Sequence, residues 1–315
     1  MHGSDPEWTT ECRDAPAPAA MTIHAPDAQT TPLLFNSPHS GRYYPASFLA
    51  QARLQRNVLA RAEDAFVDRL FAAAPRYGAP LIAARYARTF IDLNRDAYEL
   101  DAAMFEGPLP AYVTTGSPRV ADGLGTLARV VANGMEIYRG KLSFADARAR
   151  VETVYRPYHA AVRQGLTRTW ARFGVAVLID CHSMPSSRGR GGGAPDIVLG
   201  DRFGRSCAPE LIAVAEDALT ARGYRVVRNR PYAGGFFTAR YGVPADGFHA
   251  LQIEIARDLY MDEPRVLPHA NMPTLTSDIE GLMAVLVRFI DRNWALPALW
   301  RPKKGHPGNA RAAQV

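Results

Sequence analysis

The sequence predicts an α/β protein with a single folded domain. Residues 175–179 form a continuous apolar run with three β-branched residues, which is typical of a strand covered on both faces. Similar short apolar runs alternate along the chain with longer segments whose apolar residues recur at helical spacing. No internal repeat or break in composition marks a second domain within the 315 residues.

The first half of the chain predicts a leader, then strands and a helix. Residues 1–30 carry acids among their few charges and no basic-then-apolar signal pattern, so we expect a disordered leader. A short strand at residues 33–35 leads into an exit turn at residues 36–41. An amphipathic helix at residues 54–74 precedes a second strand at residues 80–84.

The second half predicts the remaining strands and helices of the domain, which we place at residues 31–296. Residues 106–125 read as a long loop or lid, and residues 127–137 as a short strand or hairpin. A long helical region at residues 144–172 contains Pro157, which should kink or break it. We further expect strands at 196–200, 225–227 and 250–255, helices at 208–222 and 274–294, loops at 229–242 and 262–271, and a mobile tail at 297–315.

Composition and charge narrow the class of protein. No apolar run approaches the roughly 18 to 20 residues needed to span a bilayer, and we expect a cytoplasmic protein. Cys12, Cys181 and Cys207 form neither a disulfide framework nor a metal pair, which fits a reducing compartment. The net charge of +6 could indicate nucleic acid, but the arginines are scattered and no stripe of stacking aromatics accompanies them. The surplus of arginine instead favours a small acidic substrate as partner.

Two histidines follow two predicted strands and suggest a metal site. His182 comes directly after the apolar run and His39 lies in the turn at residues 36–41. Polar groups at the carboxyl end of a buried strand lie where open α/β sheets place their ligands. A catalytic zinc commonly takes two histidines and a carboxylate and leaves one position open. One of Glu63, Asp64 and Asp68 could supply that carboxylate, although a solvated acidic face is the more common explanation for any one of them.

Other polar residues sit in apolar surroundings and suggest roles in binding or catalysis. Charges crowd the apolar segment at residues 88–96, which needs either a structural Arg–Asp network or a ligand. The glycine-rich loop at residues 229–235 offers donors from Asn229, Arg230 and Tyr232. Glu254 lies on a strand otherwise built for burial, so a general base or a buried pair would explain it. Cys181 adjoins His182 but points to the opposite face, which disfavours a catalytic pair.

Together these segments resemble the N-formylglutamate amidohydrolase family. The similarity runs in order from about residue 33 to about residue 289 and is specific only as a set. The segments that carry it are NSPHSG at 36–41, RxxIDLNR at 88–95, IDCHS at 179–183, NRPYxGGxxTxxYG at 229–242 and QIE at 252–254. The family is related to the zinc carboxypeptidases and aspartoacylase. The resemblance therefore implies a zinc-carboxypeptidase-like α/β fold, with a mixed, mostly parallel, twisted sheet flanked by helices.

The resemblance also implies one zinc ion and hydrolysis of N-formyl-L-glutamate to formate and L-glutamate in histidine degradation. The relatives use a His-x-x-Glu pair and a later histidine as ligands, but Arg42 stands three residues after His39. We therefore expect His39, Asp64 and His182 as ligands, with Glu63 as the second choice of carboxylate. Roles implied for other residues are catalysis by Glu254, carbonyl polarisation by Arg88, and substrate binding by Asn94, Arg95, Asn229, Arg230 and Tyr232.

Three points stay open at this level. The second carboxylate of glutamate asks for a further cation, for which the candidates are Arg188, Arg190, Arg230, Arg240 and Arg257. Another zinc amidohydrolase acting on N-acyl or formimino amino acids would fit the same residues. A non-enzymatic binder of acidic metabolites is the alternative from a different class.

Overall fold

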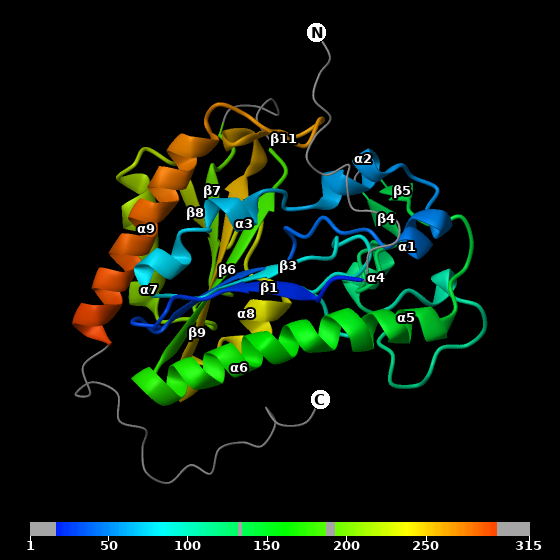
Figure 1. Cartoon of the computed structure of the whole chain (residues 1–315), viewed down its shortest axis with the longest axis horizontal. Coiled ribbons are helices and arrows are strands. Elements are labelled where there is room, and N and C mark those ends of the chain that lie inside the picture. The colour runs from blue at the N-terminus through cyan, green and yellow to red at the C-terminus, as the bar shows by residue number, and fades with distance from the viewer. Residues whose placement is uncertain (1–16, 132–133, 187–192, 295–315) are drawn as a thin grey trace.

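A seven-stranded sheet forms the centre of the molecule (Figure 1). The computed structural model describes residues 17–131, 134–186 and 193–294. Within these residues the strand order is β1-β3-β2-β6-β9-β7-β8. The strands are β1 (Met21–His24), β2 (Leu33–Ser37), β3 (Leu81–Ala84), β6 (Ala176–Met184), β7 (Ile197–Gly200), β8 (Val226–Arg228) and β9 (Phe248–Ala256).

Most neighbouring strands of this sheet are parallel. The exceptions are β1 against β3 and β7 against β9, which pair antiparallel. The predicted mixed, mostly parallel α/β sheet is therefore confirmed. The expected leader is wrong for Met21–His24, because these residues form edge strand β1 against β3. No local pattern predicts this strand, since its residues are largely exposed and its pairing partner β3 lies far away in sequence.

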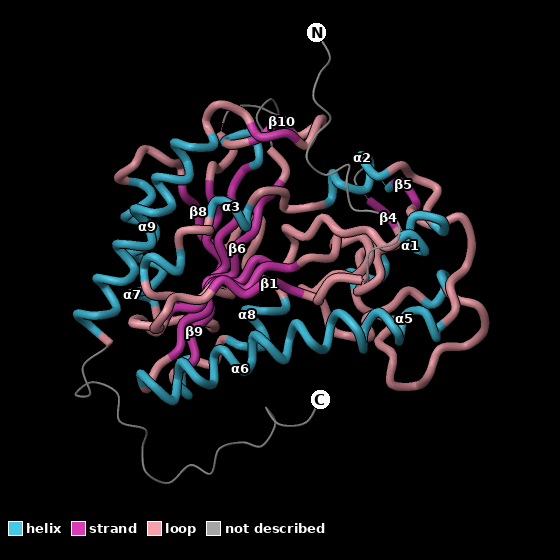
Figure 2. The backbone as a smooth tube through the Cα atoms, viewed as in Figure 1, coloured by secondary structure: helices cyan, strands magenta, loops and turns pink. Residues whose placement is uncertain are grey.

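Helices cover both faces of the sheet (Figures 1 and 2). The longest are α6 (Arg156–Phe173), α7 (Pro209–Thr220) and α9 (Met272–Asn293). One apolar core packs α7 and α9 against one face, and a second core packs α6 against the other. The shorter helices are α1 (Ala46–Gln51), α2 (Arg56–Leu59), α3 (Val67–Leu70), α4 (Pro118–Ala121), α5 (Phe144–Arg150) and α8 (Phe236–Tyr241).

Three predicted elements differ from the structure. The helix expected at residues 54–74 is broken into α2, a 3₁₀ turn and α3, because Phe66 adopts φ of 65° and the N–H of Asp64 donates to the carbonyl of His39. Pro157 does not break its helix, since a π-helical turn at Val151–Tyr155 precedes it and α6 simply continues α5. The loop expected to run through residues 237–242 instead contains α8.

The smaller elements agree with the sequence more closely. The hairpin expected at residues 127–137 contains β4 (Val130–Val131) paired with β5 (Met135–Glu136). The loop expected at residues 262–271 contains β11 (Leu267–Pro268), which pairs with β10 (Met261–Asp262). The mobile tail, Cys12, Arg188 and Arg190 lie outside the described residues. In the part of the chain that the structure describes, no helix is long and apolar enough to cross a membrane.

The three central strands change from apolar to polar along one face of the sheet. Residues two apart share a face, and Leu34, Leu178 and Ala250 on this face belong to the core that contains α6 and α8. The next residues on that face are Asn36 in β2, Asp180 and His182 in β6, and Gln252 and Glu254 in β9. The apolar half of each strand thus anchors the sheet. Of the polar residues, His182, Gln252 and Glu254 line a cavity at the carboxyl edge, whereas Asn36 and Asp180 are fully buried and do not line it.

Candidate active site

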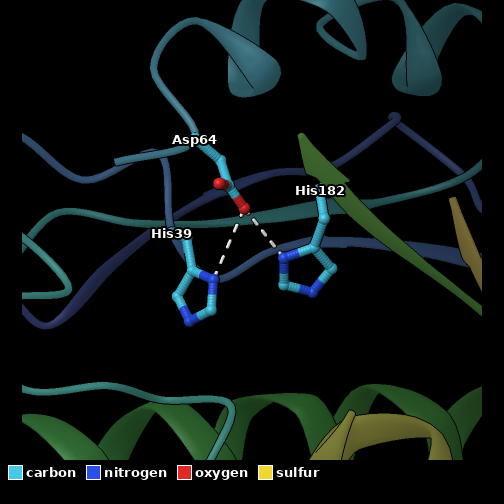
Figure 3. A group of neighbouring side chains, drawn as sticks. All are labelled: His39, Asp64 and His182. Carbon is cyan, nitrogen blue, oxygen red and sulfur yellow. Dashed lines mark hydrogen bonds and ion pairs between the residues drawn. The ribbon is translucent and has the colours of Figure 1, made fainter. Parts of the chain in front are cut away.

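His39, Asp64 and His182 converge at this edge from three separate segments (Figure 3). His39 lies in the turn after β2, Asp64 in the break before α3, and His182 within β6. The two imidazole centroids are 4.8 Å apart. The Oδ2 atom of Asp64 lies 3.4 Å from Nδ1 of His39 and 2.9 Å from Nδ1 of His182. All three side chains are buried, so the structure brings the predicted residues to one enclosed point.

The remote nitrogen of each imidazole faces a second carboxylate. Nε2 of His39 lies 2.6 Å from Oδ1 of Asp92, and Nε2 of His182 lies 3.0 Å from Oδ2 of Asp180. Asn36 holds Asp180 in turn by donating from Nδ2 to Oδ1 at 2.7 Å. With a proton on each Nε2, both Nδ1 atoms present lone pairs toward Asp64, as in metal sites with carboxylate–histidine partners.

This donor set fits a metal ion. The ligand atoms of the three residues lie within 4.8 Å of one another. Nδ1 of His39 is buried and has no hydrogen-bond partner among the described residues, which leaves a costly lone pair that a cation would satisfy. Two imidazole nitrogens and one carboxylate oxygen are the ligands of many catalytic zinc sites.

The electrostatics of the cluster favour a positive charge within it. Burial alone would raise the pKa of Asp64, but the hydrogen bond to His182 and the charge of the nearby imidazole of His39 outweigh burial and hold that pKa well below its usual range. Burial alone would lower the pKa of His182, but the charge of Asp180 and hydrogen bonds to Asp180 and Asp64 raise it well above the usual value. A cation shared by these groups, whether proton or metal, is therefore stabilised.

Two arginines hold the acids of the cluster. Arg257 is buried and donates from Nη2 to Oδ1 of Asp64 at 3.1 Å, from Nε to Ser183 Oγ and from Nη1 to the carbonyl of Arg61. Nη2 of Arg88 donates to Oδ2 of Asp92 at 2.8 Å, and its Nη1 lies 3.9 Å from Oδ1 of Asp64. Arg257 is thus committed to Asp64, and Arg88 keeps part of its guanidinium on the cavity wall.

Glu63, the second choice of carboxylate, points away from the cluster. Its carboxylate accepts a hydrogen bond from the hydroxyl of Tyr44, and burial raises the pKa of Glu63 to about 8. Consecutive residues in extended chain face opposite sides, so Asp64 and Glu63 cannot both reach the histidines.

Glu254 lies beside His182, because the two residues are paired between the neighbouring strands β9 and β6. Burial raises the pKa of Glu254 to about 7, and the charges of His182 and Arg88 oppose this increase while Asp64 favours it. Nε2 of Gln252 donates to Oε1 of Glu254 at 2.8 Å, and Oε1 of Gln252 accepts from the N–H of Gly235 at 2.7 Å. A carboxyl group that titrates near neutrality can act as a general base or acid.

Asn94 and Arg95 form another wall of the cavity. Oδ1 of Asn94 accepts from the N–H of Phe237 at 3.0 Å, and Nδ2 lies 3.3 Å from Nε2 of His182. Arg95 donates to the carbonyls of Leu124 and Asn94, while its Nη2 is only loosely paired, 3.8 Å from Asp92. The charged segment at residues 88–96 is therefore both an Arg–Asp network and a part of the cavity wall.

The glycine-rich loop contributes Tyr232 but neither of its neighbours. Tyr232 lines the cavity with Gly234 and Gly235. Asn229 and Arg230 are not among the lining residues, contrary to their expected role in substrate binding. The amide of Asn229 instead holds the loop, donating to Asp201 and accepting from the N–H groups of Asp201 and Phe203. Arg230 and Arg240 are exposed outside the cavity.

Cys181 takes no part in the site. Its side chain is buried in the core on the opposite face of the sheet, and burial raises the pKa of its thiol well above the usual value. The structure also adds residues that sequence reasoning left without a role. Asp92 and Gln252 lay inside quoted motifs, whereas Arg119 in α4 lay in the segment read as a lid and carried no signal.

The cavity measures about 670 Å³ and exposes the cluster, Glu254 and several arginines to a single space. A mostly parallel sheet with a histidine–aspartate cluster and a buried glutamate at its carboxyl edge is typical of an α/β enzyme that has its active site at that edge. The sequence narrows this class, because residues 31–261 match the model of the N-formylglutamate amidohydrolase family. The chain belongs to this family, whose members hydrolyse an amide.

Individual relatives agree with this assignment. The chain is 36% identical to the N-formylglutamate deformylase of Pseudomonas aeruginosa over 241 residues, which cover 74% of this chain and 83% of that protein. The crystal structure of N-formylglutamate amidohydrolase from Ralstonia eutropha JMP134 superposes with a TM-score of 0.81 at 37% identity, covering 87% of this chain and 99% of the other. A gene product of Agrobacterium tumefaciens shares the fold at 19% identity, with a TM-score of 0.65 over 90% of this chain and all of that one.

Proposed function

We propose that this protein is a zinc-dependent deformylase that hydrolyses N-formyl-L-glutamate to formate and L-glutamate. The observation that carries the proposal is the buried His39–Asp64–His182 cluster beside Glu254 in an arginine-lined cavity. Family membership supports the substrate, since the relatives at 34% and 36% identity are named N-formylglutamate deformylase. The reaction would supply L-glutamate within histidine degradation in the cytoplasm.

His39, Asp64 and His182 would hold the zinc ion through Nδ1, a carboxylate oxygen and Nδ1. When bound, zinc supplies a Lewis acid that polarises a carbonyl group and makes a water molecule more acidic. Asp92 and Asp180 keep the two rings in the orientation that this requires, and Arg257 keeps Asp64 in place. Each ligand thus has a buried partner that fixes it before substrate arrives.

The other residues divide the chemistry among them. Glu254 accepts a proton from the attacking water and delivers it to the departing amine, a task suited to a carboxyl whose pKa is raised to about 7. Arg88 donates to the oxygen of the formyl group as negative charge develops there. Asn94 and Arg95 bind a carboxylate of the substrate and thereby place the formyl carbon beside Glu254.

The partner that we propose is a small acidic molecule rather than a nucleic acid or a membrane. Three of the arginines that line the cavity, Arg88, Arg95 and Arg257, lie in an enclosed space beside carboxylates. Such paired charges suit recognition of a compact anion inside the cavity.

Formate release from purified, zinc-loaded protein tests the proposal. We expect turnover with N-formyl-L-glutamate and much slower turnover with N-acetyl- and N-formimino-L-glutamate. Preference for either of the latter compounds would assign the protein to another amidohydrolase reaction. Zinc-independent binding of L-glutamate without hydrolysis of any compound in the panel would make the protein a binder and overturn the proposal.

A further inference from the structure

A dicarboxylate substrate needs a cation for each of its carboxylates. The Asn94–Arg95 wall accounts for one of the two carboxylates in the proposed function. Among the described residues, the arginines that line the cavity, and that could bind the other carboxylate, are Arg61, Arg88, Arg95, Arg119 and Arg257. These arginines differ in how many of their guanidinium N–H groups already have a partner in the protein.

Three of these arginines already have a partner in the protein or a role in the proposed function. Arg257 uses Nε, Nη1 and Nη2 for Ser183, Arg61 and Asp64. Arg88 pairs with Asp92 and faces Asp64, and Arg95 serves the first carboxylate in the proposed function. Within the described ranges, the guanidinium groups of Arg61 and Arg119 make neither a hydrogen bond nor an ion pair, so both keep all their donors for a ligand.

Arg119 lies on the same wall as Arg95. Arg95 donates from Nε to the carbonyl of Leu124 at 2.8 Å, and the N–H of Leu124 donates to the carbonyl of Arg119 at 2.8 Å. Burial lowers the pKa of Arg95, and against the attraction of Asp92 the positive charges of Arg88 and then Arg119 lower it further. Because the two positively charged guanidinium groups lie on the same wall and repel each other, an anion bound between them would be stabilised. Arg61, by contrast, is exposed and belongs to the segment that carries Asp64.

The surroundings of Arg119 suit the side chain of glutamate. Leu124, Ala128 and Val130 line the cavity on this side and offer apolar contact to methylene groups. The short helix α4 is fixed in place, because Ser117 Oγ accepts from the N–H of Val120 at 3.1 Å and Val120 is buried. Asp122 also lines the cavity, and among the described residues no ion pair joins it to Arg119.

We propose that Arg119 binds the side-chain carboxylate of the substrate and makes the cavity selective for dicarboxylates, an inference that rests on the proposed function. α4 is then the element that distinguishes an acidic substrate from its neutral analogue. Arg119 is a specificity residue in this scheme and does not touch the reacting atoms.

Paired substrates test the role of Arg119. N-formyl-L-glutamine has the shape of N-formyl-L-glutamate but a neutral side chain. We expect Arg119→Gln to lower kcat/KM for N-formyl-L-glutamate about 10- to 100-fold, the range for a lost hydrogen bond to a charged group, and to leave N-formyl-L-glutamine unchanged. Arg119→Lys should restore part of the preference, and the matched variant Arg61→Gln should retain all of it.

Other outcomes overturn the inference. Equal losses for both substrates in Arg119→Gln, or loss of the preference in Arg61→Gln instead, would remove Arg119 from this role. Calorimetric binding of L-glutamate and L-glutamine to zinc-loaded protein separates this inference from the proposed reaction. Discrimination that depends on Arg119 in a protein without deformylase activity would keep the inference and reject the reaction, whereas equal binding of the two amino acids would reject the inference.

Discussion

Replacing Gln252 with leucine should shift the pH dependence of catalysis. Gln252 is buried and joins Glu254 to Gly235 through hydrogen bonds of 2.8 and 2.7 Å. Leucine has a similar volume but donates and accepts nothing, so the ionised form of Glu254 loses a donor. A hydrogen bond to a charged group contributes about 1.5 to 3 kcal/mol, which corresponds to roughly 1 to 2 pH units in the pKa of Glu254.

The direction of the shift follows from the role of Glu254 as a base. Glu254 must be ionised to accept a proton, so kcat/KM falls as pH decreases through its pKa, which burial raises to about 7. In Gln252→Leu the fall should begin at a pH about 1 to 2 units higher. The assay is formate release from N-formyl-L-glutamate at subsaturating concentration between pH 5 and pH 9, each value checked against irreversible inactivation.

A matched control separates positioning from general destabilisation. Ser206 is also buried, and its Oγ donates to the carbonyl of Ala250 at 2.8 Å. Ala250 lies on β9, as Gln252 does, but neither Ser206 nor Ala250 lines the cavity. Ser206→Ala should lower the melting temperature without moving the acidic limb of the profile. The reasoning fails if Gln252→Leu keeps the wild-type limb, or if Ser206→Ala moves it as far.

Two further substitutions test packing and buried charge. A Cβ atom added at Gly235 would lie 2.3 Å from Nδ2 of Asn94. Gly235→Ala should therefore displace that amide and raise KM for N-formyl-L-glutamate more than it lowers kcat. Unchanged kinetics would show that the amide is not needed for binding. Burial raises the pKa of Glu63 to about 8, from a value near 4.5 in the unfolded chain. The folded state therefore loses stability as pH rises above about 4.5, and the full loss of stability is present above pH 8. Glu63→Gln should therefore raise the free energy of unfolding by up to about 5 kcal/mol at pH 8.5 and by far less at pH 5. Urea titration at both pH values measures this gain, and a gain that did not grow with pH would contradict the reasoning.

The sequence located the histidines because their signal is local. His39 and His182 each accompany an apolar run, and the topology of a parallel sheet carries the ends of such runs to one edge. The sequence analysis preferred Asp64 to Glu63, and the cluster contains Asp64. The physical reason is visible only in the tertiary structure, since it depends on a break in the chain that the contact between Asp64 and the turn of His39 stabilises. The amphipathic pattern over residues 54–74 does not predict such a contact, because the contact depends on a distant segment of the chain.

Residues whose roles depend on distant partners escaped prediction. Asn229 lies in a motif rich in hydrogen-bond donors, yet its amide donates a hydrogen bond to Asp201, which lies in another loop. Arg119 gave no signal, because a single arginine in a long loop resembles any solvated residue until the fold places it beside Arg95. Strand β1 was missed for the same reason, as its stabilisation comes from pairing with β3 rather than from its own residues.

Metal content measured beside turnover tests the central claim most directly. We expect about one equivalent of zinc in the wild-type protein purified without chelator, and little in His39→Ala, Asp64→Ala or His182→Ala. Glu254→Gln should retain the zinc of the wild type and release no formate. Full zinc content in the three ligand variants, or undiminished formate release by Glu254→Gln, would contradict the assignment of this cluster and its neighbouring glutamate.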